Sequence, residues 1–202
     1  MYNWTHLQAD GFRWWIERLR TQFDLFDLVR IDHFRGFEAC WQIPADEATA
    51  INGCWMPAPG EALFQALQNE FGTLPVVAED LGLITPAVHR LREQFGFPGM
   101  RILQFAFDGG ADNPYLPHNH EVNSVVYTGT HDNNTTLAWF ESLPVEQQCS
   151  VLDYLGHPGE PVDPFEQLIT VLAVELFRRP GEGIDVAGGD RPILERARQA
   201  RC

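Results

Sequence analysis

The sequence predicts an α/β fold in which parallel strands alternate with helices. Three short apolar runs, at residues 27–32, 75–82 and 124–135, each end in charged or polar side chains. A fourth candidate strand, at residues 101–105, lies between the second and third runs. Runs of valine, isoleucine and leucine that end in polar groups are typical of parallel strands buried in a sheet. The segments between the runs have helical spacing, which favours repeated strand–helix units.

Amphipathic helices are expected between these strands. The first covers residues 10–23, with Asp10 as its N-cap. Its apolar stripe consists of Phe12, Trp15, Ile16, Leu19 and Phe23. Further helices are expected at residues 61–71, 85–95, 135–142, 144–155 and 164–177. Tryptophans on a helical stripe are usually core residues, so Trp14 and Trp15 are expected to pack rather than to bind a ligand.

Length, charge and cysteine content limit the class of protein. The 202 residues are 45% hydrophobic, so the chain can bury a sizeable core and one domain is the default expectation. A net charge of −14 argues against nucleic acid or an anionic membrane as a partner. We expect no signal peptide and no membrane span, because the longest apolar stretch, residues 168–177, is short and contains Glu175. The cysteines form no CxxC pair and no cluster with histidines. This pattern favours reduced thiols in a cytoplasmic protein. We also expect no metal site and no cofactor.

Carboxylates follow three of the predicted strands. Asp32, Glu79 and Asp132 stand at the ends of the three polar-ended runs. The carboxyl ends of parallel strands meet at one edge of a sheet, so these side chains are expected to converge on one pocket. Paired carboxylates are what the cleavage of a glycosidic bond requires. Residues 29–36 taken by themselves favour a structural ion pair of Asp32 with Arg30 or Arg35, and the two further runs favour the catalytic interpretation.

Three motifs in a fixed order carry a resemblance to a known family. Residues 30–36 (RIDHFRG), 78–82 (AEDLG) and 128–135 (TGTHDNNT) resemble the catalytic signatures of the amylomaltase, or 4-α-glucanotransferase (disproportionating enzyme), family of the α-amylase group. The likeness extends from about residue 2 to about residue 161. It implies a partial (β/α)8 TIM barrel with four parallel strands, equivalent to barrel strands 4–7, and a chain that is a central fragment of the family's fold.

This resemblance implies three segments of different character. Residues 1–160 would form the partial-barrel catalytic region, and residues 161–177 would form a helix. Residues 178–202 would form a divergent, disordered tail, because this segment holds six of the 14 arginines and lacks the apolar strand that the family's pattern implies.

The resemblance also assigns roles to individual residues. Asp32 matches the nucleophile, Glu79 the proton donor, and Asp132 the third carboxylate, which grips sugar hydroxyls. The motif residues Arg30, His33, His131 and Asn133 are expected to bind substrate. Trp55 is added to them because of its residue type and its place near the strand ends, not because of the resemblance. Asp80, on the other side of its strand, is expected to be structural. The implied reaction is the transfer of α-1,4-glucan segments between maltooligosaccharides, with retention of configuration.

The sequence is also compatible with other functions. A hydrolase or branching enzyme of the same barrel group would use the same carboxylates. A non-catalytic truncated fragment would bind glucan or self-associate through unpaired strand edges at residues 27–32 and 124–128. Trp41 and Trp55 lie in a segment rich in small residues, where each is expected either to stack on a sugar ring or to pack within a loop.

Overall fold

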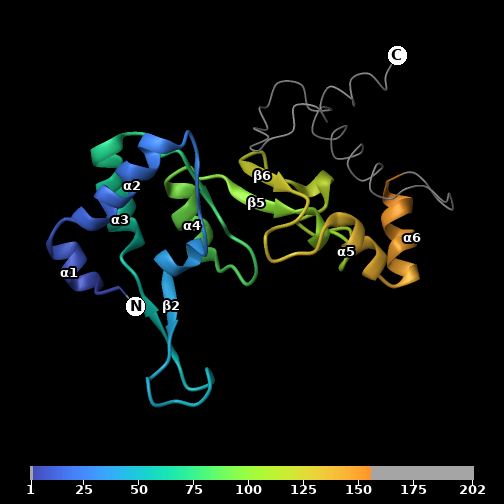
Figure 1. Ribbon diagram of the computed structural model, residues 1–202, viewed down its shortest axis with the longest axis horizontal. Coiled ribbons are helices and arrows are strands. Elements are labelled where there is room, and N and C mark those ends of the chain that lie inside the picture. Colours follow the sequence, from blue (N-terminus) through green and yellow to red (C-terminus); the bar gives the residue numbers. More distant parts are fainter. Residues whose placement is uncertain (1, 156–202) are drawn as a thin grey trace. The chain divides into compact units, whose positions relative to one another are not determined.

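The computed structural model describes residues 2–155, which form two compact units that divide between Met100 and Arg101 (Figure 1). The elements up to the division are α1 (Trp4–Ala9), α2 (Arg13–Leu25), β1 (Val29–Ile31), the 3₁₀ helix η1 (Phe34–Phe37), β2 (Ala39–Gln42), β3 (Cys54–Pro57), α3 (Gly60–Phe71), β4 (Val76–Ala78) and α4 (Pro86–Gln94). Strand β5 (Gly99–Ile102) spans the division and is followed by η2 (Leu103–Phe105), η3 (Pro117–Asn119), β6 (Ser124–Tyr127), α5 (Thr136–Ser142) and α6 (Val145–Tyr154). This alternation confirms the predicted α/β class. The helix expected at residues 164–177 and the tail expected at residues 178–202 lie outside the described residues.

Strands β1 and β4 pair in parallel, as their polar-ended sequences predicted. The register aligns three pairs of residues, Val29 with Val76, Arg30 with Val77 and Ile31 with Ala78. Strand β4 is buried along its whole length, whereas β1 is half-buried rather than buried as expected. Within residues 2–155, β4 is the only strand that pairs with β1, which leaves the other edge of β1 uncovered.

Strands β5 and β6 form a second two-stranded sheet. The backbone N–H of Ala78 in β4 donates to the carbonyl of Pro98, just before β5, at 2.9 Å. Four of the observed strands therefore correspond to the four predicted ones. Their assembly into one partial barrel, equivalent to barrel strands 4–7, stays a prediction.

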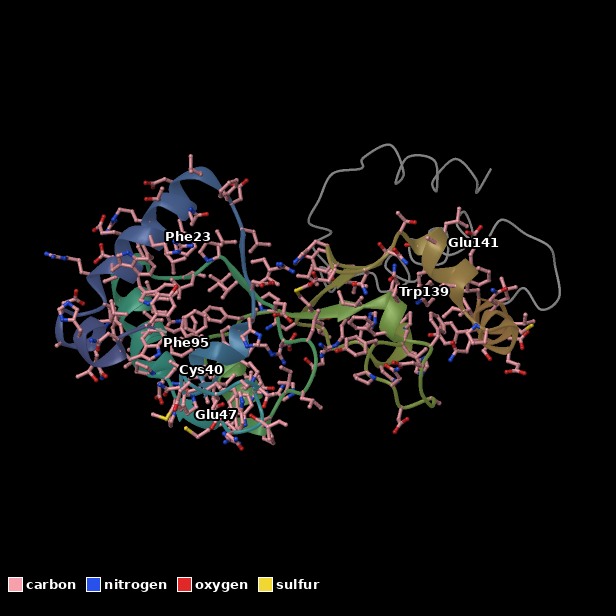
Figure 2. All side chains as sticks on the ribbon, turned by 60° about the horizontal axis from the view of Figure 1, so that its bottom comes forward. Phe23, Cys40, Glu47, Phe95, Trp139 and Glu141 are labelled. Atoms are coloured by element: carbon pink, nitrogen blue, oxygen red, sulfur yellow. The ribbon has the colours of Figure 1, made fainter. Side chains whose placement is uncertain are left out.

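An aromatic core holds the first unit together. Phe34, Phe64 and Phe97 are almost fully buried, with ring centroids between 5.1 and 6.0 Å apart. The predicted stripe of the first long helix faces this core, since Phe12, Trp15 and Leu19 are buried and Ile16 and Phe23 pack against them. Figure 2 shows Phe23 and Phe95 among the packed side chains of this unit. Trp14 packs against the Trp15 ring, with centroids 5.1 Å apart, but it is 44% exposed and is therefore not a core residue.

The start of α2 differs from the prediction. Asp10 ends the short helix α1, with its backbone N–H donating to the carbonyl of His6 at 3.1 Å, and does not cap α2. Gly11 and Phe12 then both have positive φ, at 70° and 58°. The left-handed backbone at Phe12 is unfavourable for a residue with a side chain, but it places the Phe12 ring in the core.

An ion pair joins α2 to α3 on the surface. The Arg20 guanidinium donates a short hydrogen bond to the Glu70 carboxylate. This hydrogen bond is the main cause that raises the pKa of Arg20 above its ordinary value. Both side chains are exposed, so the pair adds little to the packing that already holds the two helices together.

Residues 39–57 form an antiparallel hairpin, where only a loop was expected. Strands β2 and β3 pair so that Trp41 stands opposite Trp55 and Cys40 opposite Met56. The connection between the strands covers residues 43–53, which is too long to give the two-residue turn signal of a tight hairpin. The hairpin was missed for this reason.

The second unit follows the predicted order of helices. Thr135 caps α5 as its side-chain oxygen accepts from the N–H of Ala138 at 3.4 Å. Phe140 of α5 and Val151 of α6 form a small core. The strand expected at residues 101–105 ends at Ile102, because the next residues turn into η2 and bury Leu103.

A buried ion pair fixes α4 against the residues that follow β4. The side chains of Asp80 and Arg92 are 1% and 2% exposed, with Arg92 Nε and Asp80 Oδ2 3.4 Å apart. Asp80 Oδ1 also accepts from the backbone N–H of Met100 at 2.8 Å. A Cβ at Gly99 would lie 2.5 Å from Asp80 Oδ2, so the close packing requires glycine there. Asp80 thus has the structural role that its position in the sequence predicted.

Replacing Asp80 with asparagine should lower the free energy of unfolding by about 3–5 kcal/mol, because it leaves the Arg92 charge buried without its counter-charge. The measurement is urea unfolding of the purified chain. Glu93→Gln is the matched control, since Glu93 also lies near Arg92 but is 64% exposed. We expect the control to change stability by less than about 0.5 kcal/mol. Equal losses in both variants would contradict the assignment.

Candidate functional site

Asp32 and Glu79 directly follow the two strands of the parallel pair. The register offset is 47 residues (76 − 29), and Asp32 and Glu79, which directly follow the last aligned pair, Ile31 with Ala78, are separated by the same number of residues (79 − 32). One backbone hydrogen bond extends the pairing just past β4, since the N–H of Glu79 donates to the carbonyl of Ile31 at 3.0 Å. The N–H of Phe34 also donates to the carbonyl of Glu79, at 3.1 Å, one residue out of the register of the strands. Neighbouring strands lie about 4.8 Å apart. The structure therefore brings these two predicted residues to adjacent strand ends.

Two backbone amides hold the Glu79 carboxylate. The N–H of His33 donates to Glu79 Oε2 at 2.6 Å, and the N–H of Leu81 donates to Glu79 Oε1 at 2.9 Å. The bond from His33 comes from the turn that follows Asp32. The orientation of Glu79 is therefore tied to the conformation of the Asp32 turn.

His33 has a left-handed backbone, with φ 50° and ψ 52°. A residue other than glycine in this region costs on the order of 1–3 kcal/mol. The next residue, Phe34, is 0% exposed and its ring stacks on Phe64 at 5.5 Å. Burial of Phe34 on one side and the bond to Glu79 on the other stabilise the turn. Within the described residues, His33 and Phe12 are the only non-glycine residues with positive φ.

Arg30 and Asp32 form an ion pair at the end of β1. Arg30 Nη2 lies 2.8 Å from Asp32 Oδ1, and the Asp32 side chain is 66% exposed. Arg35, the other partner considered from the sequence, instead donates to the carbonyl of Leu83 at 2.7 Å. Arg30 thus orients one Asp32 oxygen while the rest of the carboxylate stays accessible.

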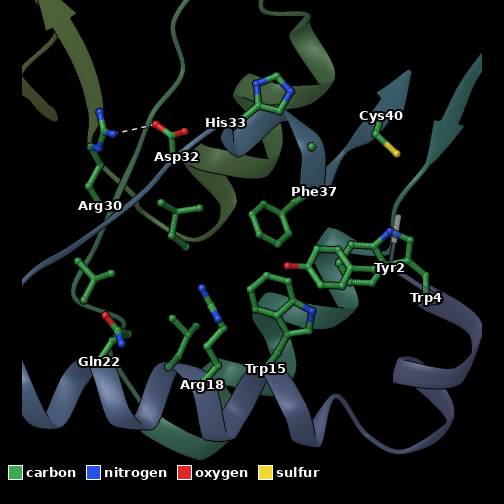
Figure 3. Close-up of a pocket in the computed structure, with 14 residues that line it drawn as sticks. Tyr2, Trp4, Trp15, Arg18, Gln22, Arg30, Asp32, His33, Phe37 and Cys40 are labelled. Carbon is green, nitrogen blue, oxygen red and sulfur yellow. Dashed lines mark hydrogen bonds and ion pairs between the residues drawn. The ribbon is translucent and has the colours of Figure 1, made fainter. Parts of the chain in front are cut away.

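A pocket of about 580 Å³ opens beside Asp32 in the first unit (Figure 3). Its aromatic wall is formed by Tyr2, Trp4, Trp15 and Phe37. Asp32 supplies the only carboxylate among the lining residues. The volume lies within the range of about 300–1,000 Å³ that is common for small-molecule sites. The pocket gives Asp32 an apolar neighbourhood on one side.

The remaining polar strand end lies in the second unit. Asp132 and His131 are adjacent and exposed, with His131 Nε2 and Asp132 Oδ2 3.4 Å apart. Asn133 Oδ1 accepts from both the backbone N–H and the hydroxyl of Thr130, at 2.8 and 2.7 Å. The side-chain oxygen of Asn133 thus helps to fix the loop that carries Asp132. That these residues join Asp32 and Glu79 around one substrate stays a prediction.

Trp55 is exposed on the hairpin of the first unit. Its ring lies edge-on to Trp41, with centroids 5.5 Å apart, and the Arg35 guanidinium carbon lies 4.0 Å from its ring centre. Sequence reasoning missed the contact between Arg35 and Trp55, since it depends on a hairpin that the sequence did not reveal. It also missed the hydrogen bond from the backbone N–H of His33 to Glu79, because almost every residue type has a backbone N–H and the sequence therefore does not reveal which one donates.

Two further features are absent from the described part of the chain. Across residues 2–155, no group of three or more His, Cys, Asp or Glu side chains is arranged to hold a metal ion. In the same part of the chain, no helix has the length and apolar character that crossing a membrane requires.

Comparisons with known proteins agree with the resemblance. The sequence profile of the 4-alpha-glucanotransferase family matches residues 1–178. A 4-alpha-glucanotransferase of Thermus thermophilus is 55% identical over 161 residues, which cover 79% of this chain and 32% of that protein. A chloroplastic/amyloplastic 4-alpha-glucanotransferase of Solanum tuberosum is 50% identical over 160 residues, 79% of this chain and 28% of the relative.

A solved structure supports the same assignment. The amylomaltase of Streptococcus agalactiae, solved in complex with acarbose, matches with a TM-score of 0.77 and 40% sequence identity over 84% of this chain and 35% of that one. The chain thus spans about a third of the length of the relatives it matches. Because the family profile covers most of its length, the chain belongs to the 4-alpha-glucanotransferase family.

Proposed function

We propose that this chain carries the catalytic carboxylates of a 4-α-glucanotransferase that transfers α-1,4-glucan segments between maltooligosaccharides. The observation that supports this most strongly is the register of β1 and β4, whose last aligned pair, Ile31 with Ala78, directly precedes Asp32 and Glu79. Retaining glycosidases place their two carboxyl groups about 5–5.5 Å apart, close to the spacing of neighbouring strands of about 4.8 Å. Adjacent strand ends therefore favour a retaining mechanism over an inverting one.

In the first step, a carboxylate oxygen of Asp32 attacks the anomeric carbon of the donor glucan. Glu79 gives its proton to the glycosidic oxygen, so the bond breaks and the leaving segment departs with a free 4-hydroxyl group. The product is a β-linked glucosyl ester on Asp32. Arg30 engages one Asp32 oxygen, which leaves the exposed remainder of the carboxylate for the attack.

In the second step, the 4-hydroxyl group of an acceptor glucan attacks the same anomeric carbon from the opposite face. Glu79, now ionised, takes the hydroxyl proton, and Asp32 leaves as a carboxylate. Two inversions give an α-linked product. In this proposal Asp132 binds sugar hydroxyls of the reacting glucose, and His131 and Asn133 on the same loop assist it.

The substrate class follows from the same proposal. The acarbose complex of the S. agalactiae amylomaltase supports an α-glucan as the ligand class for this chain. Neither a nucleic acid nor a membrane surface is proposed as a partner, given the net charge of −14. A cytoplasmic location and self-association through strand edges stay predictions. The relatives include proteins named as chloroplastic/amyloplastic.

Incubation with maltotriose separates transfer from hydrolysis. A transferase should yield glucose together with a ladder of longer maltooligosaccharides, whereas a hydrolase gives only shorter sugars. The measurement is chromatography of the products from this chain and from Asp32→Ala. We expect the ladder from the unaltered chain and none from the variant. Equal, negligible turnover in both would favour a non-catalytic, glucan-binding fragment.

The roles of the two carboxylates can be tested separately with α-glucosyl fluoride. Fluoride departs without a proton, so Glu79→Gln should still form the glucosyl ester and release a burst of fluoride equivalent to the enzyme. With maltotriose, which needs protonation, the same variant should be at least about 100-fold slower. Asp32→Asn should show neither burst nor turnover. A fluoride burst from Asp32→Asn would contradict its assignment as the nucleophile.

A further inference from the structure

The hairpin of the first unit presents an exposed apolar surface that the mechanism above does not use. Its exposed members are Trp41 (39%), Ile43 (39%), Ile51 (80%), Trp55 (49%) and Met56 (41%). Leu83, on the loop that follows Glu79, is 90% exposed.

The two tryptophans of this surface have different surroundings. Trp41 holds the hairpin connection together, because its indole N–H donates to the carbonyl of Ala50 at 2.8 Å. Gly53 lies against the Trp41 ring so closely that a Cβ there would be 2.4 Å from it. Trp41 is therefore a packing residue of the loop. The indole N–H of Trp55 makes no hydrogen bond within the described residues, so it is available to a ligand.

Arg35 fixes the Trp55 ring with respect to the catalytic turns. Its guanidinium lies 4.0 Å from the centre of the Trp55 ring and donates to the carbonyl of Leu83 at 2.7 Å. Arg35 belongs to η1, which directly follows the Asp32 turn, and Leu83 lies on the loop that follows Glu79. One side chain thus connects β3 to both carboxylate-bearing turns. An exposed ring that is held in this way loses little freedom when a ligand stacks on it.

We propose that Trp55 is a stacking platform for a glucose unit of the α-1,4-glucan, in a subsite beside the catalytic carboxylates, and that Arg35 is its positioning residue. This inference rests on the proposed function. The broad apolar face of an indole suits the C–H face of a pyranose, and its N–H can donate to a sugar hydroxyl. A neutral, hydroxyl-rich chain also meets no repulsion from a protein with a net charge of −14.

Calorimetric titration with maltoheptaose tests the platform, with every variant made in an Asp32→Ala background to prevent turnover. Trp55→Ala should weaken binding about tenfold, while Trp55→Tyr, which keeps a stacking ring, should stay within about threefold. Trp14→Ala is the matched control, because Trp14 is 44% exposed and carries Arg18 at 5.3 Å from its ring, yet lies on α2. We expect the control to bind as the parent does.

The role of Arg35 has its own measurement. Arg35→Lys keeps the charge but loses the planar fork that both stacks and donates. In NMR spectra, the Trp55 indole N–H resonance should shift on addition of maltoheptaose in the parent, and Arg35→Lys should need about threefold more ligand for the same shift. If Arg35 had only a structural role, Arg35→Lys would lower the unfolding temperature but would need no more maltoheptaose to shift the Trp55 resonance.

Several outcomes would overturn the platform. These are an absence of maltoheptaose binding in the parent, equal losses in Trp55→Ala and Trp14→Ala, or self-association abolished by Trp55→Ala while glucan affinity is unchanged. The last result would assign the surface to a protein contact. Binding that depends on Trp55 in a chain that makes no maltotriose ladder would support the platform and contradict the proposed catalytic function.

Discussion

The parallel pairing of β1 with β4 is the constraint on which the rest of the site depends. Its last aligned pair, Ile31 with Ala78, directly precedes Asp32 and Glu79, so the pairing brings the two carboxylates to adjacent strand ends. A shift by one residue would turn one carboxylate to the other side of the sheet. Val76 and Ala78 of β4 are buried in the aromatic core, so the core that stabilises the fold also helps to fix this register.

The turn after Asp32 connects the buried core to the Glu79 carboxylate. His33 adopts an unfavourable left-handed backbone, and the burial of Phe34 together with the bond to Glu79 offsets that cost. Strain of this kind persists only where the surroundings over-determine it. The same turn leads into η1, from which Arg35 reaches Trp55 and the loop after Glu79. A substitution in the turn should therefore affect both carboxylates and the hairpin.

Residue patterns predicted much of this arrangement, and the reasons for the failures are specific. Apolar runs with polar ends identified β1 and β4, because a strand that is buried in a parallel sheet consists mostly of apolar residues. The β2–β3 hairpin was missed because its pairing spans a long connection, and with it the contact between Arg35 and Trp55. The amide of His33 was missed because backbone donors are the same in every residue. The place of Asp132 beside Asp32 and Glu79 stays a prediction.

The hydrogen bond from the His33 amide to Glu79 tests the central claim most directly, since it exists only if the two strand ends are neighbours. In a pH titration followed by NMR, the amide protons of His33 and Leu81 should shift together, because both donate to the same carboxylate. Glu79→Gln should abolish both responses. If the Leu81 amide responds while the His33 amide ignores both pH and the substitution, then Asp32 and Glu79 are not on adjacent strand ends and the account is wrong.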